Sequence, residues 1–369
     1  MVSIASPESL TSSITMSTSR IFLKLDLLQP SGSFKSRYYN LNSSYPTMAN
    51  GELTVTRGIG NFIRTALQDP TNKGRELHFY ISSGGNAGLA AVIAARDLNC
   101  QCTVVVPHST KPMMVQKLRD VGAADVFQHG DNWFEADAHL RKTFIENQDP
   151  DSVKRNVYVP PFDHPDVWKG AETMIDEIAR QMPSREEGLK TSFPADVVVC
   201  SVGGGGLFNG IVQGLGRYHQ SQTREVAEGN KVRVLAVETK GADSLAFSLQ
   251  NGSLQSLPGI KSLATSLGAV RVAPQALKNA QSPPTGVDVV SAVGSDAEAA
   301  KGVIRLADEQ RLQVELACGI SIELGTMKLK EYFRDLAPES RVVVVVCGGS
   351  NVSSEIIAEY RQKIQDGWE

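Results

Sequence analysis

The chain has 369 residues, of which 41% are hydrophobic and 21% charged, and its formal net charge is −3. This composition suits one large or two medium globular domains with an ample core. It argues against nucleic acid and membrane surfaces as partners, and no apolar run approaches the ~20 residues of a membrane-spanning helix.

The first twenty residues are rich in Ser and Thr, with one Arg and one Glu. They lack the apolar core of a secretory signal and the repeated Arg of a transit peptide. The five cysteines are odd in number and form no C-x-x-C pair: Cys100, Cys102, Cys200, Cys318 and Cys347. We therefore expect a cytoplasmic protein with buried, reduced thiols rather than a disulfide framework or a zinc site.

Lys35 follows a run of small residues and an aromatic, Ser31–Phe34, after the strand-like stretch Ile21–Leu25. A lysine is usually a solvated surface charge. Lys35 becomes a candidate for chemistry only because several polar, glycine-rich stretches occur further along the chain.

From about residue 77, short apolar runs alternate with helical stretches. The predicted strands are 77–81, 103–106, 125–127, 157–159, 196–202, 232–238 and 341–347, with helices at 86–98 and 111–121. Continuous Val/Ile/Leu runs indicate strands covered on both faces. Strands separated by helices predict an α/β fold with mostly parallel sheets.

Three glycine-rich loops follow predicted strands: Ser82–Gly88, Gly203–Leu207 and Cys347–Asn351. Ligands of open parallel sheets bind beyond the carboxyl ends of the strands. Four consecutive glycines before a helix leave backbone N–H groups bare, which suits a phosphate but is also typical of a flexible turn. Neither a Walker loop nor the G-x-G-x-x-G spacing is present, so the phosphate should belong to something smaller than a dinucleotide.

The other two loops are ambiguous alone. Ser82–Gly88 offers donors for a carboxylate, and Asn86 could bond a ring oxygen, yet Ser and Asn also cap helices commonly. Cys347 ends an all-valine strand and could be a core cysteine. A lysine for a Schiff base, a phosphate loop, a carboxylate loop and a polar strand end together predict pyridoxal phosphate and amino-acid chemistry.

The sequence resembles the fold-type II pyridoxal-phosphate enzymes, and within them the L-serine/L-threonine dehydratases (ammonia-lyases). The resemblance runs from about Ile21 to Ile364. Its specific stretches are 28–37 (LQPSGSFKSR), 82–88 (SSGGNAG), 158–163 (YVPPFD), 201–207 (SVGGGGL), 314–319 (VELACG) and 346–351 (VCGGSN).

The resemblance implies two parallel-sheet α/β domains of the tryptophan-synthase-β-like architecture, with the cofactor in the cleft between them. Residues 1–28 and 164–369 would form the large, cofactor-binding catalytic domain. Residues 29–163 would form the small domain that closes on the substrate.

Carried over position by position, the resemblance also implies the site residues. Lys35 would be the catalytic Schiff-base lysine, Phe34 would pack on the pyridine ring, Asn86 would bond its 3′ oxygen and Cys347 would face its nitrogen. The phosphate would be held by Gly203, Gly204, Gly205, Gly206 and Leu207. The substrate carboxylate would be held by Ser83, Gly84 and Ala87. A monovalent cation such as potassium would be held by Glu238, Ala242 and Ser244, with the stretch 267–269 nearby.

The activity that the resemblance implies is a carbon–nitrogen lyase. L-Serine would give pyruvate and ammonia, and L-threonine 2-oxobutanoate, by β-elimination through an aminoacrylate, in serine catabolism or gluconeogenesis. The alternatives are a threonine-preferring dehydratase, a serine racemase, and a weakly active or non-catalytic relative. Threonine-preferring biosynthetic enzymes usually carry a C-terminal regulatory domain, for which we expect no room here. A homodimer with a small amino-acid substrate is expected.

Two departures from the family pattern stand out. Gly84 replaces the usual Ala or Ser, and we expect the missing side chain to enlarge the corner beside the substrate. Residues 38–57 separate Arg37 from Gly58, which are adjacent in the family's F-K-x-R-G. The helical spacing resumes at Ile59, and twenty codons are an in-frame length with sequences compatible with splice signals. We interpret 38–57 as an atypical insert and hypothesise a retained intron.

Overall fold

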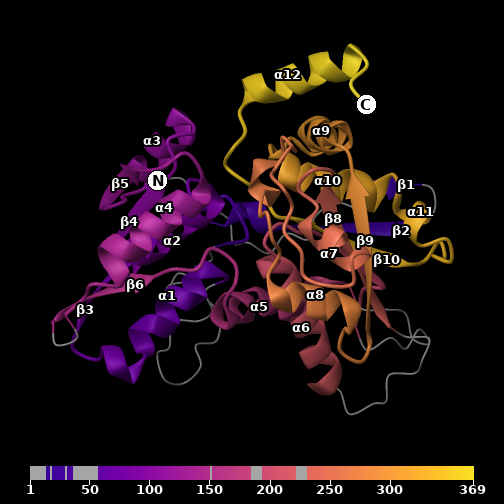
Figure 1. The fold of residues 1–369 in the computed structure, drawn as a ribbon. Coiled ribbons are helices and arrows are strands. Elements are labelled where there is room, and N and C mark those ends of the chain that lie inside the picture. Colours follow the sequence, from indigo (N-terminus) through magenta and orange to yellow (C-terminus); the bar gives the residue numbers. More distant parts are fainter. Residues whose placement is uncertain are drawn as a thin grey trace, which may run out of the picture. The chain divides into compact units, whose positions relative to one another are not determined.

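The computed structural model describes residues 14–16, 19–29, 31–35, 57–149, 152–183, 193–221 and 231–369. The chain divides into two packed units: unit 1 is Met1–Leu28 with Glu172–Glu369, and unit 2 is Gln29–Ala171. Each unit has a sheet of its own with helices packed on it, which confirms the predicted two-domain α/β class (Figure 1).

Unit 1 holds a six-stranded sheet in the order β1-β2-β10-β7-β8-β9. Its strands are β1 Ile14–Met16, β2 Ser19–Leu25, β7 Val197–Ser201, β8 Val232–Thr239, β9 Val287–Gly294 and β10 Arg341–Val346. β1 is antiparallel to β2, and the other pairs are parallel. Every residue of β7 and β10 is buried. Because successive side chains point to opposite faces of a sheet, both faces are covered here, as the continuous valine runs predicted.

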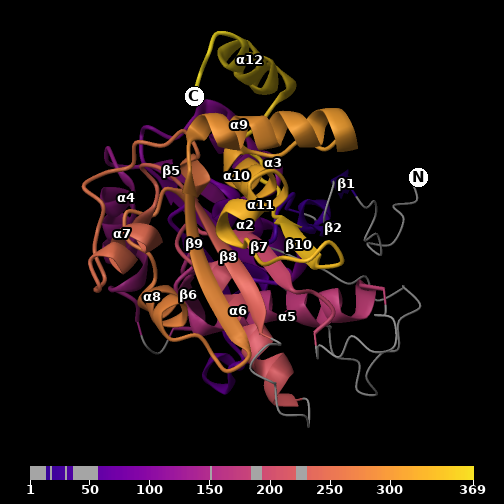
Figure 2. The same ribbon diagram turned by 90° about the vertical axis from the view of Figure 1, so that its right-hand side faces the viewer.

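The helices of unit 1 are α6 Gly206–Ser221, α7 Ser244–Gln250, α8 Pro274–Gln281, α9 Asp296–Arg305, α10 Leu316–Thr326, α11 Leu329–Tyr332 and α12 Ser354–Gln365. Its short helical turns are η1 Asp26–Leu28, η4 Thr265–Leu267 and η5 Leu306–Gln310. α5 (Pro165–Gln181) crosses the division between the units. α10 packs on β7, β8 and β10, and α9 packs on α10 on the side away from the strands (Figures 1 and 2).

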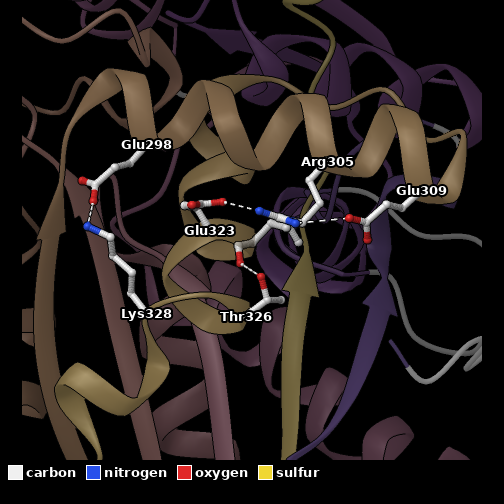
Figure 3. A network of polar contacts seen from close by, with 7 residues as sticks. Glu298, Arg305, Glu309, Glu323, Thr326 and Lys328 are labelled. Carbon is white, nitrogen blue, oxygen red and sulfur yellow. Dashed lines mark hydrogen bonds and ion pairs between the residues drawn. The ribbon is translucent and has the colours of Figure 1, made fainter. Parts of the chain in front are cut away.

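Two glycines let α9 and α10 approach closely. A Cβ at Gly302 would lie 1.9 Å from the carbonyl oxygen of Gly319, and a Cβ at Gly319 would lie 2.2 Å from that of Ala299. Ion pairs tie the same helices together along their length (Figure 3). Arg305 pairs with Glu323 at 3.5 Å, and Lys328, just after α10, pairs with Glu298. Unit 1 therefore has a tightly fixed helical layer over its sheet.

Unit 2 holds a four-stranded, fully parallel sheet in the order β5-β4-β3-β6. Its strands are β3 Glu76–Ile81, β4 Gln101–Val106, β5 Asp125–Gln128 and β6 Lys154–Tyr158. Its helices are α1 Ile59–Gln68, α2 Asn86–Asp97, α3 Pro112–Asp120 and α4 Trp133–Leu140, with the turns η2 Pro70–Asn72 and η3 Arg141–Ile145. α2 is the central helix, because it is buried from Asn86 to Ala95 and contacts α1, α3, β3 and β4.

The insert predicted at 38–57 lies outside the described residues except for Arg57, but the chain on its two sides meets. The Ile59 N–H donates to the Lys35 carbonyl at 3.1 Å, and α1 begins at Ile59 as the spacing predicted. Without twenty intervening residues this bond would join residues four apart, the spacing of an α-helical turn. Arg57 is fully buried beside this junction.

Among the described residues, none of the helices combines the length and the apolar character needed to cross a membrane.

Candidate active site

Lys35 lies in unit 2 on the stretch that precedes α1. Its Nζ donates to the carbonyl of Pro161 at 3.3 Å and lies 4.9 Å from the centroid of the Phe34 ring. The stretch is fixed locally, since the buried Ser31 hydroxyl lies 3.2 Å from both the hydroxyl and the carbonyl oxygen of Ser33. The structure thus brings the candidate lysine to the YVPPFD stretch, which has Pro161 in its middle.

The loop Ser82–Gly88 connects β3 to α2. Asn86 is the first residue of α2, and Asn86 and Ala87 are both buried. The N-cap residue of this helix is Gly85, which has no side chain to cap it. The first N–H groups of a helix have no partner within the helix, and its amino end favours negative charge. Ser83, Gly84 and Ala87 therefore surround a helix start whose chemistry suits a carboxylate.

The corner beside Gly84 is not enlarged, contrary to the expectation from sequence. A Cβ at Gly84 would lie 2.6 Å from Cγ2 of Thr110 and 3.1 Å from its hydroxyl oxygen. The space left by the missing side chain is therefore filled by a residue from the loop after β4. A second distant residue, Trp133, donates from its indole Nε1 to the Ser82 carbonyl at 2.6 Å.

The four glycines from Gly203 to Gly206 join β7 to α6 in unit 1. A Cβ at Gly203 would lie 3.1 Å from Cα of Leu267, and one at Gly205 would lie 2.7 Å from Cβ of Ala276. Gly205 also has a φ of +94°, which side-chain-bearing residues rarely adopt. Packing and backbone both require glycine here, and Leu267 lies against this loop.

Cys347 follows β10 in unit 1 and has a mostly buried thiol. The Sγ of Cys347 lies 3.5 Å from the Ser201 hydroxyl. The Cys318 thiol forms a hydrogen bond with Cys347. Burial raises the pKa of the Cys318 thiol, which therefore stays protonated. The carboxylate group of Glu315 packs where a Cβ of Gly349 would be, 2.0 Å from it, so the start of α10 holds the loop after β10.

The chain is similar to known proteins over most of its length. A family described as "Pyridoxal-phosphate dependent enzyme" matches residues 10–348. The chain belongs to this family. It is 37% identical to an L-serine dehydratase of Saccharomyces cerevisiae over 343 residues, which cover 90% of this chain and 89% of the relative. It is 36% identical to the human "Serine dehydratase-like" protein, covering 90% and 86%.

A solved structure is similar to this chain as well. The fungal L-serine ammonia-lyase from Rhizomucor miehei aligns with a TM-score of 0.74 and 31% identity, covering 93% of both chains. The expected family and the two parallel-sheet α/β units are thereby confirmed.

The residues of this pyridoxal-phosphate enzyme fit its cofactor on structural grounds. At 203–206, leucine and alanine neighbours occupy the space that side chains would take. The backbone before α6 is therefore uncovered by side chains, and the first N–H groups of α6 suit a phosphate. Lys35 carries a primary amine beside an aromatic ring, as a Schiff-base lysine needs. The roles of the individual residues remain predictions.

The predicted cation ligands come together at the end of β8. Both carboxylate oxygens of the fully buried Glu238 accept N–H groups of α7, from Leu245 and Ala246, each at 2.8 Å. Burial raises the pKa of Glu238 to about 8 against the opposing effect of these two bonds. In the described part of the chain, the buried Ser244 hydroxyl has no hydrogen-bond partner. Ala242 is buried in the intervening turn.

Sequence reasoning missed the residues that support the site rather than form it. These are Pro161 beside Lys35, Thr110 and Trp133 around the loop 82–88, and Cys318 beside Cys347. Pro161 and Cys318 lie within stretches that resemble the family, which was a usable signal. Thr110 and Trp133 lie in ordinary loop and helix sequence that gave none.

Proposed function

We propose that this protein is a pyridoxal-phosphate-dependent L-serine dehydratase that converts L-serine to pyruvate and ammonia. It would also convert L-threonine to 2-oxobutanoate and ammonia. The observation that carries the proposal is similarity to an L-serine dehydratase over about nine tenths of both chains, in a chain that has the lysine and the three glycine-rich loops.

The cofactor would be held covalently by Lys35, through its phosphate by Gly203–Gly206 with Leu207, and at its ring by Phe34, Asn86 and Cys347. When bound, pyridoxal phosphate supplies an electron sink for the charge that develops at the substrate Cα. Lys35 Nζ would remove the Cα proton. The donors at the start of α2 would orient the substrate carboxylate.

Net conversion consumes no external reactant. The Cα–H and Cβ–O bonds break and the hydroxyl leaves as water. Water then returns as the released enamine tautomerises and hydrolyses to pyruvate and ammonium. Cys347 would place a thiol where a carboxylate would stabilise a proton on the ring nitrogen, which favours rapid β-elimination over transamination.

A potassium ion would be held by Glu238 with Ser244 and Ala242. The buried Ser244 hydroxyl, which has no hydrogen-bond partner in the described part of the chain, supports this assignment, because a cation would give its oxygen a partner. A homodimer in the cytoplasm is the assembly and location that the resemblance suggests.

The test is an assay of purified protein, with pyridoxal phosphate and L-serine, for pyruvate. We expect activity in the wild type and none in Lys35→Ala, which should also lose the visible absorbance of the bound cofactor. Replacing potassium by a bulky organic cation should lower the rate. Production of D-serine without pyruvate would indicate a racemase, and a rate higher with L-threonine would indicate the threonine-preferring alternative.

The remaining alternative, a weakly active relative, depends on the insert. A variant lacking residues 38–57 leaves Arg37 directly before Gly58, at the place of the buried Arg57, and keeps both residues of the bond from Ile59 to Lys35, so we expect it to fold. If the insert impairs the site, this variant will exceed the wild type in turnover at unchanged cofactor content. Equal turnover would show that the insert is tolerated, and loss of folding would show that it is part of the native structure.

A further inference from the structure

Within the loop Ser82–Gly88, the Ser83 carbonyl packs against Gly88, where a Cβ would lie 2.0 Å from its oxygen, but Gly84 and Gly85 between them have no side chain. Gly84 and Gly85 are consecutive, and glycine has more conformational freedom than any other residue. Inside the loop, the Gly85 N–H donates to the Ser83 hydroxyl at a long 3.4 Å. A loop that must present its donors to a carboxylate therefore needs support from outside.

Thr110 provides a contact at the centre of this loop. The Cβ that Gly84 lacks would lie 2.6 Å from Thr110 Cγ2, whereas two carbons in favourable contact lie about 3.5–4.0 Å apart. Thr110 Cγ2 therefore packs directly on the backbone of Gly84. Val106, the last residue of β4, flanks the same space at 3.3 Å.

Thr110 is itself well anchored. Its N–H donates to the Pro107 carbonyl at 3.0 Å in the turn after β4, and α3 begins two residues later. Threonine is branched at Cβ, which restricts its side chain at χ1. It is therefore a stiff, half-buried support, made of a methyl and a hydroxyl group, in the turn that follows β4.

We propose that Thr110 is a positioning residue for substrate binding: it replaces the missing side chain of Gly84 and holds the carboxylate-binding loop in place. This inference rests on the proposed function, which assigns that loop to the substrate carboxylate. L-Serine and L-threonine share the carboxylate, so Thr110 should affect the binding of both by the same factor.

The test is a double-mutant cycle of Thr110→Ala and Gly84→Ala. Thr110→Ala removes the support, and we expect KM for L-serine and for L-threonine to rise by about fivefold, with kcat nearly unchanged. Gly84→Ala forces a methyl group against Thr110 and should lower kcat/KM by roughly tenfold or more, with a lower unfolding temperature. The double variant should recover most of both losses, because the new methyl group takes the space that Thr110 vacates.

Thr71→Ala is the matched control, since Thr71 is an exposed threonine of the same unit. A purely structural role of Thr110 would lower the unfolding temperature and leave KM unchanged, which would overturn the inference. So would losses in the double variant that equal the sum of the single ones.

Failure of the proposed function is separable from failure of the inference. A wild type that makes no pyruvate from L-serine would refute the function. Calorimetric binding of L-serine to the same variants then tests the inference, and equal Kd values for wild type and Thr110→Ala would overturn it.

Discussion

Two of the glycine-rich loops of the candidate site, 82–88 and 203–206, are fixed in different ways. The loop at 203–206 needs glycine at its own positions: Gly205 has a φ of +94°, and Leu267 and Ala276 crowd the places of the missing side chains. The loop at 82–88 also needs glycine at 84 and 88, but it is held in addition by distant residues, through the Thr110 contact and the Trp133 hydrogen bond. Substitution of a glycine should therefore damage either loop, whereas substitution of Thr110 or Trp133 should damage only the loop at 82–88.

The largest effect in this comparison should come from Gly205→Ala. A side chain in the left-handed region costs about 1–2 kcal/mol, to which the 2.7 Å approach to Ala276 adds. We expect cofactor affinity, measured by fluorescence titration of the apoprotein with pyridoxal phosphate, to fall about tenfold or more. The KM for L-serine at saturating cofactor should change little.

Gly252→Ala is the control for Gly205→Ala. Gly252 also has a positive φ, +66°, but no atom lies within 4 Å of its missing Cβ. It reproduces the backbone strain without the crowding and lies in a turn after α7. Equal losses of cofactor affinity in the two variants would mean that the glycine loop is not the phosphate site.

This contrast explains which parts of the site could be predicted from sequence. The glycines and Lys35 could be recognised from sequence because the residue types that the predicted chemistry needs stand at these positions themselves. Thr110 and Trp133 act across 26 and 51 positions of sequence, on Gly84 and Ser82, and only the packed sheet brings them together.

The same distinction applies to the fold. The continuous valine strands and α2 were predicted within a few residues of their observed ends. β9 was missed because Asp288 and Ser291 interrupt its apolar run at the edge of the sheet. α10 was missed because it is buried on all sides and so shows no amphipathic period.

A smaller effect is expected from Trp133→Phe, which keeps the aromatic ring and removes the donor to Ser82. Such a hydrogen bond contributes about 0.5–1.5 kcal/mol, so KM for L-serine should rise about two- to tenfold while cofactor affinity stays unchanged. Trp368→Phe is the control, because Trp368 lies near the carboxyl terminus beside Lys363 and Tyr360. A lower cofactor affinity with unchanged KM would reverse the assignment of the two loops.

The smallest expected effect is a pH dependence of the stability of α4, the helix that begins with Trp133. His139, on the same helix α4, stacks on His129 with ring centroids 3.8 Å apart. Burial, and then the neighbouring His129, lower the pKa of His139 below its usual value of 6.5. The unfolded chain therefore binds the proton more readily than the folded chain, and the stabilisation present above pH ~6.5 is lost as the pH falls.

Between pH 7 and 5, the unfolding temperature of His139→Gln should fall less than that of the wild type. His108→Gln, at an exposed position of the same unit, should retain the wild-type slope. If His139→Gln has that slope too, protonation of this histidine pair does not weaken α4.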